Sequence, residues 1–368
     1  MDMCESEQVP RAEEAVQPET VRLHPEADAI LAVHGDAVSD IRKKFLVSSA
    51  VLSVASDYFK ALLRSDFKEG LETRRGDCPT ILMGEDDPEA MEVILSILHY
   101  RKSQVYDRLD PETLAAVALH SDKYDCTRAL RPWTFQWFRN VTGTSNADEL
   151  GFFLVAAYFL RSSEHFKDIS ARAVRQAKAN LESVWAEHDM ITLLPQEIKG
   201  AARRPRLPSA RRLTLLDALT ARVSGILDKL HRELQSVEGR LRRQERGYEM
   251  GGRLCMSCGR RLPATAKQCR PCYNTTVQEE YCTNQTRIAE YFAVLGRSGL
   301  WPSVGPFQNC TISELANRFS RAKDDRQHQC SAGVDCPLRR ALEGLSESVD
   351  QIVKDIRGVS LDLGSMSS

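Results

Sequence analysis

The sequence predicts a mixed α/β (α+β) domain at the N-terminus, followed by a mainly α-helical extension that carries a small cysteine-bearing insert. Three observations support this fold class. Short apolar strands lie close to apolar helices up to about residue 138, helical apolar periods continue after it, and two C-x2-C pairs lie between residues 255 and 272. The chain of 368 residues has room for roughly two or three domains, and its apolar content of 42% is enough to build their cores.

Residues 45–70 are the most informative stretch of the N-terminal part. Phe45–Val47 is a short apolar strand, and Ser48 and Ser49 offer oxygen atoms that can cap the start of a helix. Apolar residues then recur at helical spacing, at Val51, Leu52, Val54, Tyr58, Phe59, Leu62 and Leu63. An acidic, glycine-terminated turn at residues 66–70 ends the stretch. We therefore expect a strand that leads into two short apolar helices, packed on more than one side.

Further strands and helix starts surround this stretch. Residues 29–33 and 80–83 are apolar runs of strand length, and residues 34–36 indicate a turn. Asp87-Pro88 and Asp110-Pro111 each place a capping carboxylate before a proline at the first helical position. Residues 1–20 are polar and have no apolar period, which predicts a disordered N-terminus before a domain at residues 21–138.

These segments resemble the BTB/POZ domain, in particular the group of BTB proteins found widely in fungi. The resemblance is carried by VRLHPEADAIL, FLVSSAVLSVASDYFKALL, DDPEAMEVILSILHYR and SDKYDCTRALRPW, and it covers most of residues 21–138. Ser48 stands where animal members usually have histidine, and serine is common there in the fungal group. The resemblance implies a protein-interaction domain that docks on a cullin scaffold or self-associates as a homodimer. Cullin contacts of the family fall near residues 71–77 of this chain, where none transfers residue by residue.

Residues 145–247 predict a helical extension, which the resemblance places where other BTB proteins have BACK-type helices. The longest apolar run, residues 150–160, is far shorter than the roughly 20 residues that a membrane helix needs, so we expect a core helix and no membrane partner. Residues 199–212 carry six basic residues and no acid. This run suits a nuclear-import signal or a nucleic-acid patch, but a solvated linker is the favoured interpretation.

Residues 213–247 predict a long amphipathic helix. Its apolar residues step by threes and fours, close to the period of a coiled-coil seam, at Leu216, Leu219, Val223, Ile226, Leu230, Leu234, Val237 and Leu241. The seam fits a coiled-coil dimer or packing against other helices of the same chain, and the pattern does not choose between them.

The strongest chemical signal is the set Cys255, Cys258, Cys269 and Cys272, in a predicted module of residues 248–282. Zinc takes four soft ligands in a tetrahedron, and each C-x2-C turn supplies two thiolates, so the pattern predicts a small zinc ribbon. Four cysteine ligands leave no open position, so such a zinc ion is structural rather than catalytic. The alternatives are an irregular loop with unligated cysteines or a redox pair. Gly259 after the second cysteine fits a zinc knuckle, whereas Tyr273 in the corresponding place departs from the pattern.

Basic residues surround these cysteines, and no acid lies between residues 251 and 278; the basic residues are Arg253, Arg260, Arg261, Lys267 and Arg270. With a zinc ion on four thiolates, the net charge of this segment is about +3. That charge suits an acidic partner or a phosphate backbone, but neutralisation of the anionic metal centre is the simpler explanation. No aromatic residues alternate with the basic ones, so nucleic-acid binding is not expected.

A second metal site is a weaker alternative in the predicted helical region of residues 283–368. Its candidate ligands are Cys282, Cys310, His328, Cys330 and Cys336, but no pair has a standard knuckle spacing. Free cysteines buried as small apolar side chains are therefore the default interpretation. The last amphipathic helix of this region is predicted to stop at Gly358.

The whole sequence favours a protein-interaction function over catalysis. Its net charge of -1 indicates no general attraction to nucleic acid or membrane, and no signal peptide begins it, so we expect a cytoplasmic and/or nuclear protein. No catalytic residues are predicted, because phosphate-binding loops, nucleophile elbows and H-E-x-x-H motifs are absent, and His99 and His120 are expected to make local hydrogen bonds. Two classes remain: a substrate adaptor of a cullin-RING ubiquitin ligase, and a self-associating scaffold or transcription- or chromatin-linked regulator.

Overall fold

The computed structural model describes residues 18–34, 41–64, 66–101, 104–143, 146–194 and 215–360. Contacts within the chain divide it into two units, an N-terminal unit of residues 1–140 and a C-terminal unit of residues 141–368. Each unit has its own set of buried apolar side chains. The predicted linker at residues 199–212 and most of the predicted disordered N-terminus lie outside the described residues.

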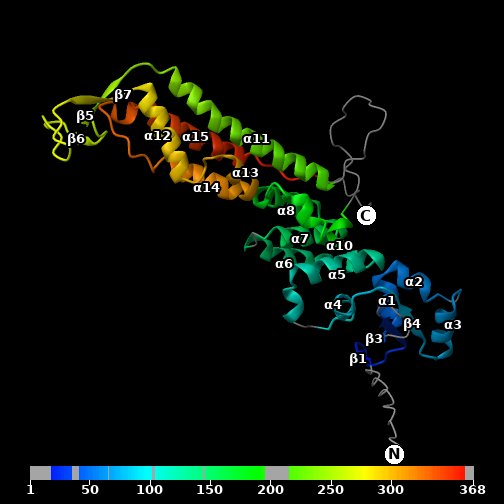
Figure 1. The fold of residues 1–368 in the computed structure, drawn as a ribbon. Helices are drawn as coiled ribbons and strands as arrows, with labels where there is room; N and C mark the ends of the chain where they lie inside the picture. Colours follow the sequence, from blue (N-terminus) through cyan, green and yellow to red (C-terminus); the bar gives the residue numbers. More distant parts are fainter. Residues whose placement is uncertain are drawn as a thin grey trace, which may run out of the picture. The chain divides into compact units, whose positions relative to one another are not determined.

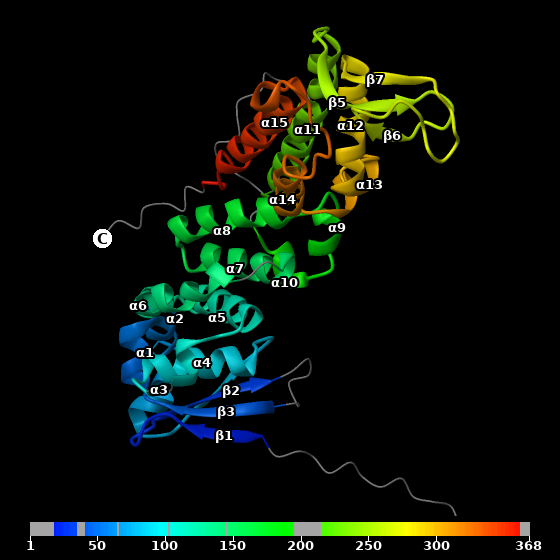
Figure 2. The same cartoon turned by 90° about the vertical axis from the view of Figure 1, so that its left-hand side faces the viewer.

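The N-terminal unit is built on a four-stranded sheet with the order β1-β3-β2-β4. The strands are β1 (Glu19–Arg22), β2 (Ala29–His34), β3 (Ile41–Val47) and β4 (Thr80–Met83). β2 and β3 are antiparallel, whereas β1 pairs with β3 and β4 pairs with β2 in parallel. Figure 2 shows β1, β3 and β2 side by side. β2 lies between β3 and β4, and its residues Leu31, Ala32 and Val33 are fully buried. A strand covered on both faces is expected to be apolar at consecutive positions, as β2 is.

The three predicted strands are confirmed, with two boundary corrections. β3 begins at Ile41, four residues before the predicted start, because Ile41, Lys43 and Lys44 also pair with β2, with a register shift that leaves Arg42 unpaired in the ladder. β1 includes Glu19 and Thr20, which the sequence pattern placed in the disordered N-terminus. The cause is pairing with a distant strand, since Glu19 lies opposite Lys43 and forms a 3.0 Å ion pair with it.

Six α-helices accompany the sheet within the described part of the N-terminal unit. They are α1 (Ser49–Ala55), α2 (Asp57–Leu62), α3 (Lys68–Arg75), α4 (Pro88–Leu98), α5 (Pro111–Lys123) and α6 (Thr127–Phe138), with 3-10 turns at Gln104–Asp107 and Arg139–Gly143. The predicted Asp-Pro starts are confirmed: Asp87 accepts a hydrogen bond from the Ala90 N–H at 2.6 Å, and Asp110 accepts one from the Thr113 N–H at 3.0 Å. The predicted face of α4, which includes Met91 and Leu95, is buried.

Two local predictions in residues 45–70 need correction. Ser48 is the N-cap residue of α1, but its side chain makes no capping bond; the Asp28 carboxylate accepts from the Ser49 N–H at 2.7 Å and from the Ser49 hydroxyl at 2.6 Å instead. The predicted turn that ends at Gly70 is the start of α3. Gly70 is needed for close packing rather than for a helix stop, because a Cβ atom there would lie 1.9 Å from the Arg64 carbonyl oxygen.

Asp86 joins several helices of the N-terminal unit through a buried hydrogen-bond network. Its side chain has no exposed surface, lies 3.1 Å from His120 Nδ1 and 2.7 Å from Lys123 Nζ, and accepts a hydrogen bond from the Tyr124 hydroxyl. The Tyr124 ring stacks on Phe59 of α2 at 5.4 Å, so the network connects α5 and the loop before α4 to α2. Burial of the Asp86 carboxylate favours its neutral form, but these hydrogen bonds outweigh burial and hold the pKa of Asp86 below its ordinary value.

The described residues in the first half of the C-terminal unit form four shorter helices and one long helix. The short ones are α7 (Ala147–Phe159), α8 (Ser163–Gln176), α9 (Leu181–Trp185) and α10 (Asp189–Thr192), and the long one is α11 (Leu215–Arg242). α7 is buried through residues 150–157, which confirms the predicted core helix. Within the part of the chain that the structure describes, no helix combines the length and the apolar character needed to cross a membrane.

α11 packs its apolar seam against helices of the same chain. It lies beside α15 (Pro337–Lys354), α12 (Asn284–Arg297) and α14 (Ile312–Ala322) (Figure 1). Six of the eight predicted seam residues are buried: Leu219, Val223, Leu230, Leu234, Val237 and Leu241. Leu216 and Ile226 are only half-buried, and Leu215, outside the predicted seam, is buried instead. The intramolecular alternative therefore accounts for the seam without a second chain. The helix ends at Arg242, short of the predicted residue 247, and the buried Arg287 of α12 donates to the carbonyl oxygens of Gln244 and Arg246 beyond that end.

Along the chain, a small sheet follows α11 and precedes the last helices. The sheet has the order β6-β5-β7, with β5 (Tyr248–Cys255), β6 (Arg261–Pro263) and β7 (Val277–Cys282) all antiparallel to their neighbours. α13 (Val304–Asn309) and a 3-10 turn (Gly333–Asp335) complete the unit. α15 ends at Lys354, before the predicted stop at Gly358; a Cβ atom on Gly358 would lie 1.7 Å from the Lys167 carbonyl oxygen, so this glycine allows close approach to α8.

Leu52→Asp should unfold the N-terminal unit, because it puts an unpaired carboxylate at a fully buried position of α1. Val54→Asp in the same helix is the matched control, since Val54 is 91% exposed. We expect thermal melting of the N-terminal unit to be lost in the first variant and nearly unchanged in the second. Equal melting of Leu52→Asp and the wild-type protein would contradict the placement of Leu52.

Acid should destabilise the N-terminal unit through Asp86. A carboxylate whose pKa is lower in the folded state stabilises that state above its unfolded pKa of about 4, and this stability is lost as the pH falls through the folded pKa. Asp86→Asn should therefore lower the free energy of unfolding at pH 7 by about 3 kcal/mol and flatten its decline on acidification. Hydrogen exchange in α4 and α5 measures the free energy of unfolding at pH 7 and its decline on acidification, after correction for the intrinsic exchange rate at each pH. The exposed Asp57→Asn is the control, and an unchanged acid profile in Asp86→Asn would exclude this role.

Candidate functional site

The four predicted zinc ligands meet at one end of the β6-β5-β7 sheet. Cys255 is the last residue of β5, Cys258 follows in the turn to β6, and Cys269 and Cys272 lie in the loop between β6 and β7. Their sulfur atoms all lie within 4.8 Å of one another. Three separations are close to the edge of about 3.8 Å expected for a tetrahedron of sulfurs around zinc: 3.4 Å for Cys255 to Cys272, and 3.6 Å from Cys258 to Cys269 and to Cys272. We call these four residues the cysteine tetrad.

Both knuckles of the tetrad have the same backbone conformation. Gly259 has a φ of 68° and Tyr273 a φ of 54°, so both are left-handed. The Cys255 N–H donates to the Arg260 carbonyl oxygen at 3.0 Å, and in the same position of the second knuckle the Cys269 N–H donates to the Asn274 carbonyl oxygen at 2.9 Å. Tyr273 therefore adopts the conformation for which glycine is usually needed, and its departure from the sequence pattern does not alter the second knuckle.

The thiols of the tetrad differ in acidity. Hydrogen bonding from the Cys258 N–H, against the effect of burial, lowers the pKa of Cys255 to about 6. Burial of Cys269, reinforced by the neighbouring thiols, raises its pKa to about 12. A metal ion bound by all four sulfurs would hold them together as thiolates.

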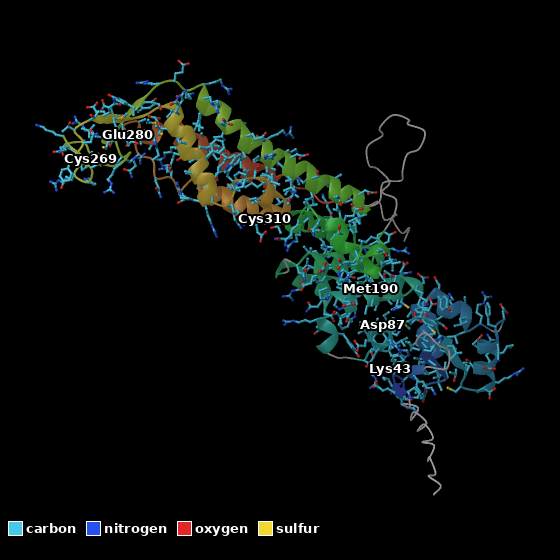
Figure 3. All side chains as sticks on the ribbon, in the orientation of Figure 1. Lys43, Asp87, Met190, Cys269, Glu280 and Cys310 are labelled. Atoms are coloured by element: carbon cyan, nitrogen blue, oxygen red, sulfur yellow. The ribbon has the colours of Figure 1, made fainter. Side chains whose placement is uncertain are left out.

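The sheet places acidic residues next to the basic residues that surround the tetrad. Arg261 lies 2.7 Å from Glu280 on β7, and Arg253 lies 3.8 Å from Glu279; Glu280 and Cys269 are labelled in this region in Figure 3. These two arginines therefore have carboxylate partners on β7, and neutralisation of a metal centre by the basic residues stays a prediction. The carboxylates also remove about two units from the predicted positive charge, which weakens the case for a phosphate ligand.

The sheet has almost no apolar core besides its cysteines. Among residues 248–282 the fully buried side chains are Cys255, Cys269 and Cys282. A three-stranded sheet without buried aliphatic or aromatic side chains needs another source of stability. The tetrad supplies a suitable donor set, since four cysteines at this separation can hold a metal ion.

Four of the five remaining candidate ligands also come together. Cys282, His328, Cys330 and Cys336 have their ligand atoms within 4.8 Å of one another, and we call them the Cys3His cluster. Cys310 is buried in another part of the C-terminal unit, away from the tetrad and this cluster (Figure 3). Spacing along the sequence made this cluster only a weaker alternative, because Cys282 lies in a segment far from the other three members.

His99 and His120 make the structural hydrogen bonds predicted for them. His99 Nε2 accepts from the Ser48 N–H at 3.0 Å, and its Nδ1 lies 2.8 Å from the Leu95 carbonyl oxygen. His120 Nε2 accepts from the Asp87 N–H at 3.0 Å. Desolvation in the core lowers the pKa of His99, which keeps the ring neutral.

An open apolar groove lies on the N-terminal unit. Its volume is ≈ 990 Å³, and its lining comes from α1, the end of α4 and α6: Ala50, Val51, Val54, Ala55, Ile97, Leu98, Tyr100, Arg101, Arg128, Ala129, Pro132 and Trp133. Val54 and Tyr100 are 91% and 90% exposed. The two charged residues of the lining, Arg101 and Arg128, are both basic. We call this surface the α1–α6 groove.

The sequence pattern placed Val54 and Tyr58 with the core residues of the apolar helices, and the structure corrects this. Both side chains are exposed, Val54 almost completely and Tyr58 by 44%. The sequence does contain a sign of this exposure, because the apolar residues of α1 spread too far around the helix: Val51, Leu52 and Val54 cannot all share one narrow helix face. An apolar stretch wider than one face indicates a second apolar surface, which here borders the α1–α6 groove.

Comparison with known proteins agrees with this fold and with an interaction surface. Residues 24–133 match the BTB/POZ domain family, and the match includes β2 to β4 and every residue that lines the α1–α6 groove. No curated protein matches the chain. The N-terminal unit of this protein is therefore a BTB/POZ domain, a protein-interaction module, followed by a mostly helical region with a cysteine cluster that could hold a metal ion.

Proposed function

We propose that this protein is a non-enzymatic adaptor whose BTB/POZ domain docks a protein partner in the α1–α6 groove. The observation that carries the proposal is the exposure of Val54 and Tyr100 beside an apolar groove of ≈ 990 Å³. Exposed apolar side chains around a concavity favour association, because covering them removes apolar surface from water. The two basic residues of the lining favour a partner segment that joins apolar and acidic side chains.

A cullin scaffold is the partner class that we propose first. The BTB/POZ fold supports it, and so does α3, which covers the segment where the sequence resemblance placed cullin contacts. Phe67 at the start of α3 is 49% exposed and Leu71 is 42% exposed, so apolar contact area is available there. In this version the helical region captures the substrate of a cullin-RING ubiquitin ligase. We also propose that the BTB/POZ domain is of the type found in fungal BTB proteins.

The alternative is a self-associating BTB scaffold, with the rest of the chain recruiting transcription or chromatin partners. The basic run at residues 199–212 favours a nuclear location for this version. The ion pairs of Arg253 and Arg261 with β7 weigh against nucleic acid as its direct ligand. Either version suits a cytoplasmic and/or nuclear protein with reduced thiols.

We further propose that the cysteine tetrad binds one structural zinc ion within a ribbon of residues 248–282. Thiolate ligands favour zinc among the common divalent ions, and four protein ligands complete its tetrahedron. In this division of the chain, a BTB/POZ domain at 21–138 is followed by a helical extension at 145–247, the ribbon, and a helical region at 283–368.

Val54→Asp should abolish partner binding without unfolding the domain. A carboxylate in the α1–α6 groove must lose water when an apolar segment binds, so we expect at least about a tenfold loss of cullin recovery. The measurement is affinity purification of the full-length chain from its native cells, with quantitative mass spectrometry. Val304→Asp on α13, at a site that is 68% exposed, is the matched control.

Self-association is measured on the same purified variants by light scattering. Cullin recovered with the wild type and Val304→Asp, but not with Val54→Asp, supports the adaptor. If the wild type is a dimer, Val54→Asp is a monomer and no sample contains cullin, the groove is the self-association surface of the scaffold alternative. Equal partner recovery and equal mass for both variants would reject docking in the groove.

The double variant Cys258→Ser/Cys272→Ser should lose one zinc ion per chain, and the backbone N–H groups of the ribbon should lose their protection from hydrogen exchange. Both thiols are exposed, so the substitution disturbs packing little apart from the metal. We expect fast hydrogen exchange at residues 248–282 and unchanged exchange in the BTB/POZ domain. Cys78→Ser, an exposed cysteine of the N-terminal unit, is the control. Zinc content equal to that of the wild type would contradict the tetrad as a zinc site.

A further inference from the structure

The Cys3His cluster gathers its ligands from three segments of the C-terminal unit. Cys282 is the last residue of β7 and directly precedes Thr283, the N-cap of α12. His328 and Cys330 lie in the connection between α14 and α15, and Cys336 is the N-cap of α15. His328 Nε2 lies 3.1 Å from Cys282 Sγ, although the two residues are 46 positions apart. The fold, rather than a local turn, therefore brings these donors together.

The cluster is buried where its surroundings offer little else to fix the chain. Cys282, His328 and Cys336 are buried and Cys330 is half-buried. From residue 323 to residue 336, the buried side chains are His328 and Cys336, both members of the cluster. Backbone bonds assist, as in the Ser331 N–H that donates to the Glu249 carbonyl oxygen at 2.7 Å, but no apolar side chain of this connection is buried.

Cys336 lies at the N-cap position of α15, although its side chain makes no capping hydrogen bond there. The N-terminus of a helix stabilises negative charge, which favours the thiolate form of a cysteine at that position. The place of Cys336 therefore suits a ligand sulfur.

The cluster is separate from the cysteine tetrad, at the opposite end of the same strand pair. Cys255 pairs with Val277 at one end of the β5–β7 ladder, and Cys282 pairs with Tyr248 at the other. With a strand rise of about 3.3 Å per residue, the two ends are roughly 20 Å apart. One metal ion cannot serve both sets.

We propose that Cys282, His328, Cys330 and Cys336 bind a second zinc ion, in a structural Cys3His centre that fastens the ribbon to α12 and α15. Three thiolates and one imidazole are a common zinc ligand set, and with four protein ligands no position remains open for substrate. Zinc at both ends of the β5–β7 ladder fixes the ribbon relative to the helices of its own unit. The proposal is independent of the partner that binds the BTB/POZ domain.

The number of zinc ions per chain in the purified full-length protein tests the proposal. Mass spectrometry of the metal content should give two zinc ions in the wild type, and one in His328→Ala and in Cys336→Ser. His328→Cys should keep both, since it replaces one zinc ligand by another. Cys310→Ser, a buried cysteine outside the tetrad and the cluster, should also keep both.

A variant that keeps the Cys3His cluster intact tests the proposal even if the cluster variants fail to fold. Cys258→Ser/Cys272→Ser removes ligands of the tetrad alone, so one zinc ion remaining in that chain supports the second centre, and none overturns it. Unchanged zinc in His328→Ala and Cys336→Ser overturns it as well, as does a disulfide among Cys282, Cys330 and Cys336 in protein purified without reductant. If the tetrad variant and the wild type both hold one zinc ion that Cys336→Ser removes, the tetrad proposal fails and the Cys3His centre stands.

Discussion

The lack of an apolar core in residues 248–282 is the constraint on which this part of the C-terminal unit depends. Its fully buried side chains are cysteines, so hydrophobic burial cannot account for the order of its strands. A buried leucine contributes about 1.5–3 kcal/mol, whereas binding of a structural zinc ion in a small peptide releases roughly 10–16 kcal/mol. One metal ion can thus replace the burial of about five large side chains.

The N-terminal unit is stabilised in a different way. Its sheet buries Leu31, Phe45 and Val47 completely, and the carboxylate of Asp86 has several hydrogen-bond donors in its buried site. Such a network adds little net stability compared with apolar side chains of the same shape, but it is costly to disrupt. It also fixes geometry, because Tyr124 contacts both Asp86 and the ring of Phe59. The two units should therefore respond to different conditions, the first to acid and the second to metal removal.

The parts of the fold that the sequence predicts are those set by local chemistry. Asp87 and Asp110 bond to N–H groups three residues later, so their helix starts follow from neighbouring residues alone. The two C-x2-C pairs are local in the same sense. β1 could not be predicted to begin at Glu19, because the polar residues Glu19 and Thr20 become a strand only through pairing with β3. The sequence could offer the Cys3His cluster only as a weaker alternative that still included Cys310, since Cys282 and His328 meet only after the helices between them have packed.

The α1–α6 groove shows why a functional surface is hard to separate from a core in the sequence. Leu52 and Val54 are two positions apart, which is about 200° around a helix, so they face opposite directions. Leu52 has no exposed surface and Val54 is 91% exposed, yet both are aliphatic. Apolar patterning alone therefore cannot tell which side of α1 faces the core. The exposed valine adds nothing to that core, and its contact with water is relieved only when another surface covers it. We interpret the excess apolar width of α1 as a requirement of binding rather than of folding.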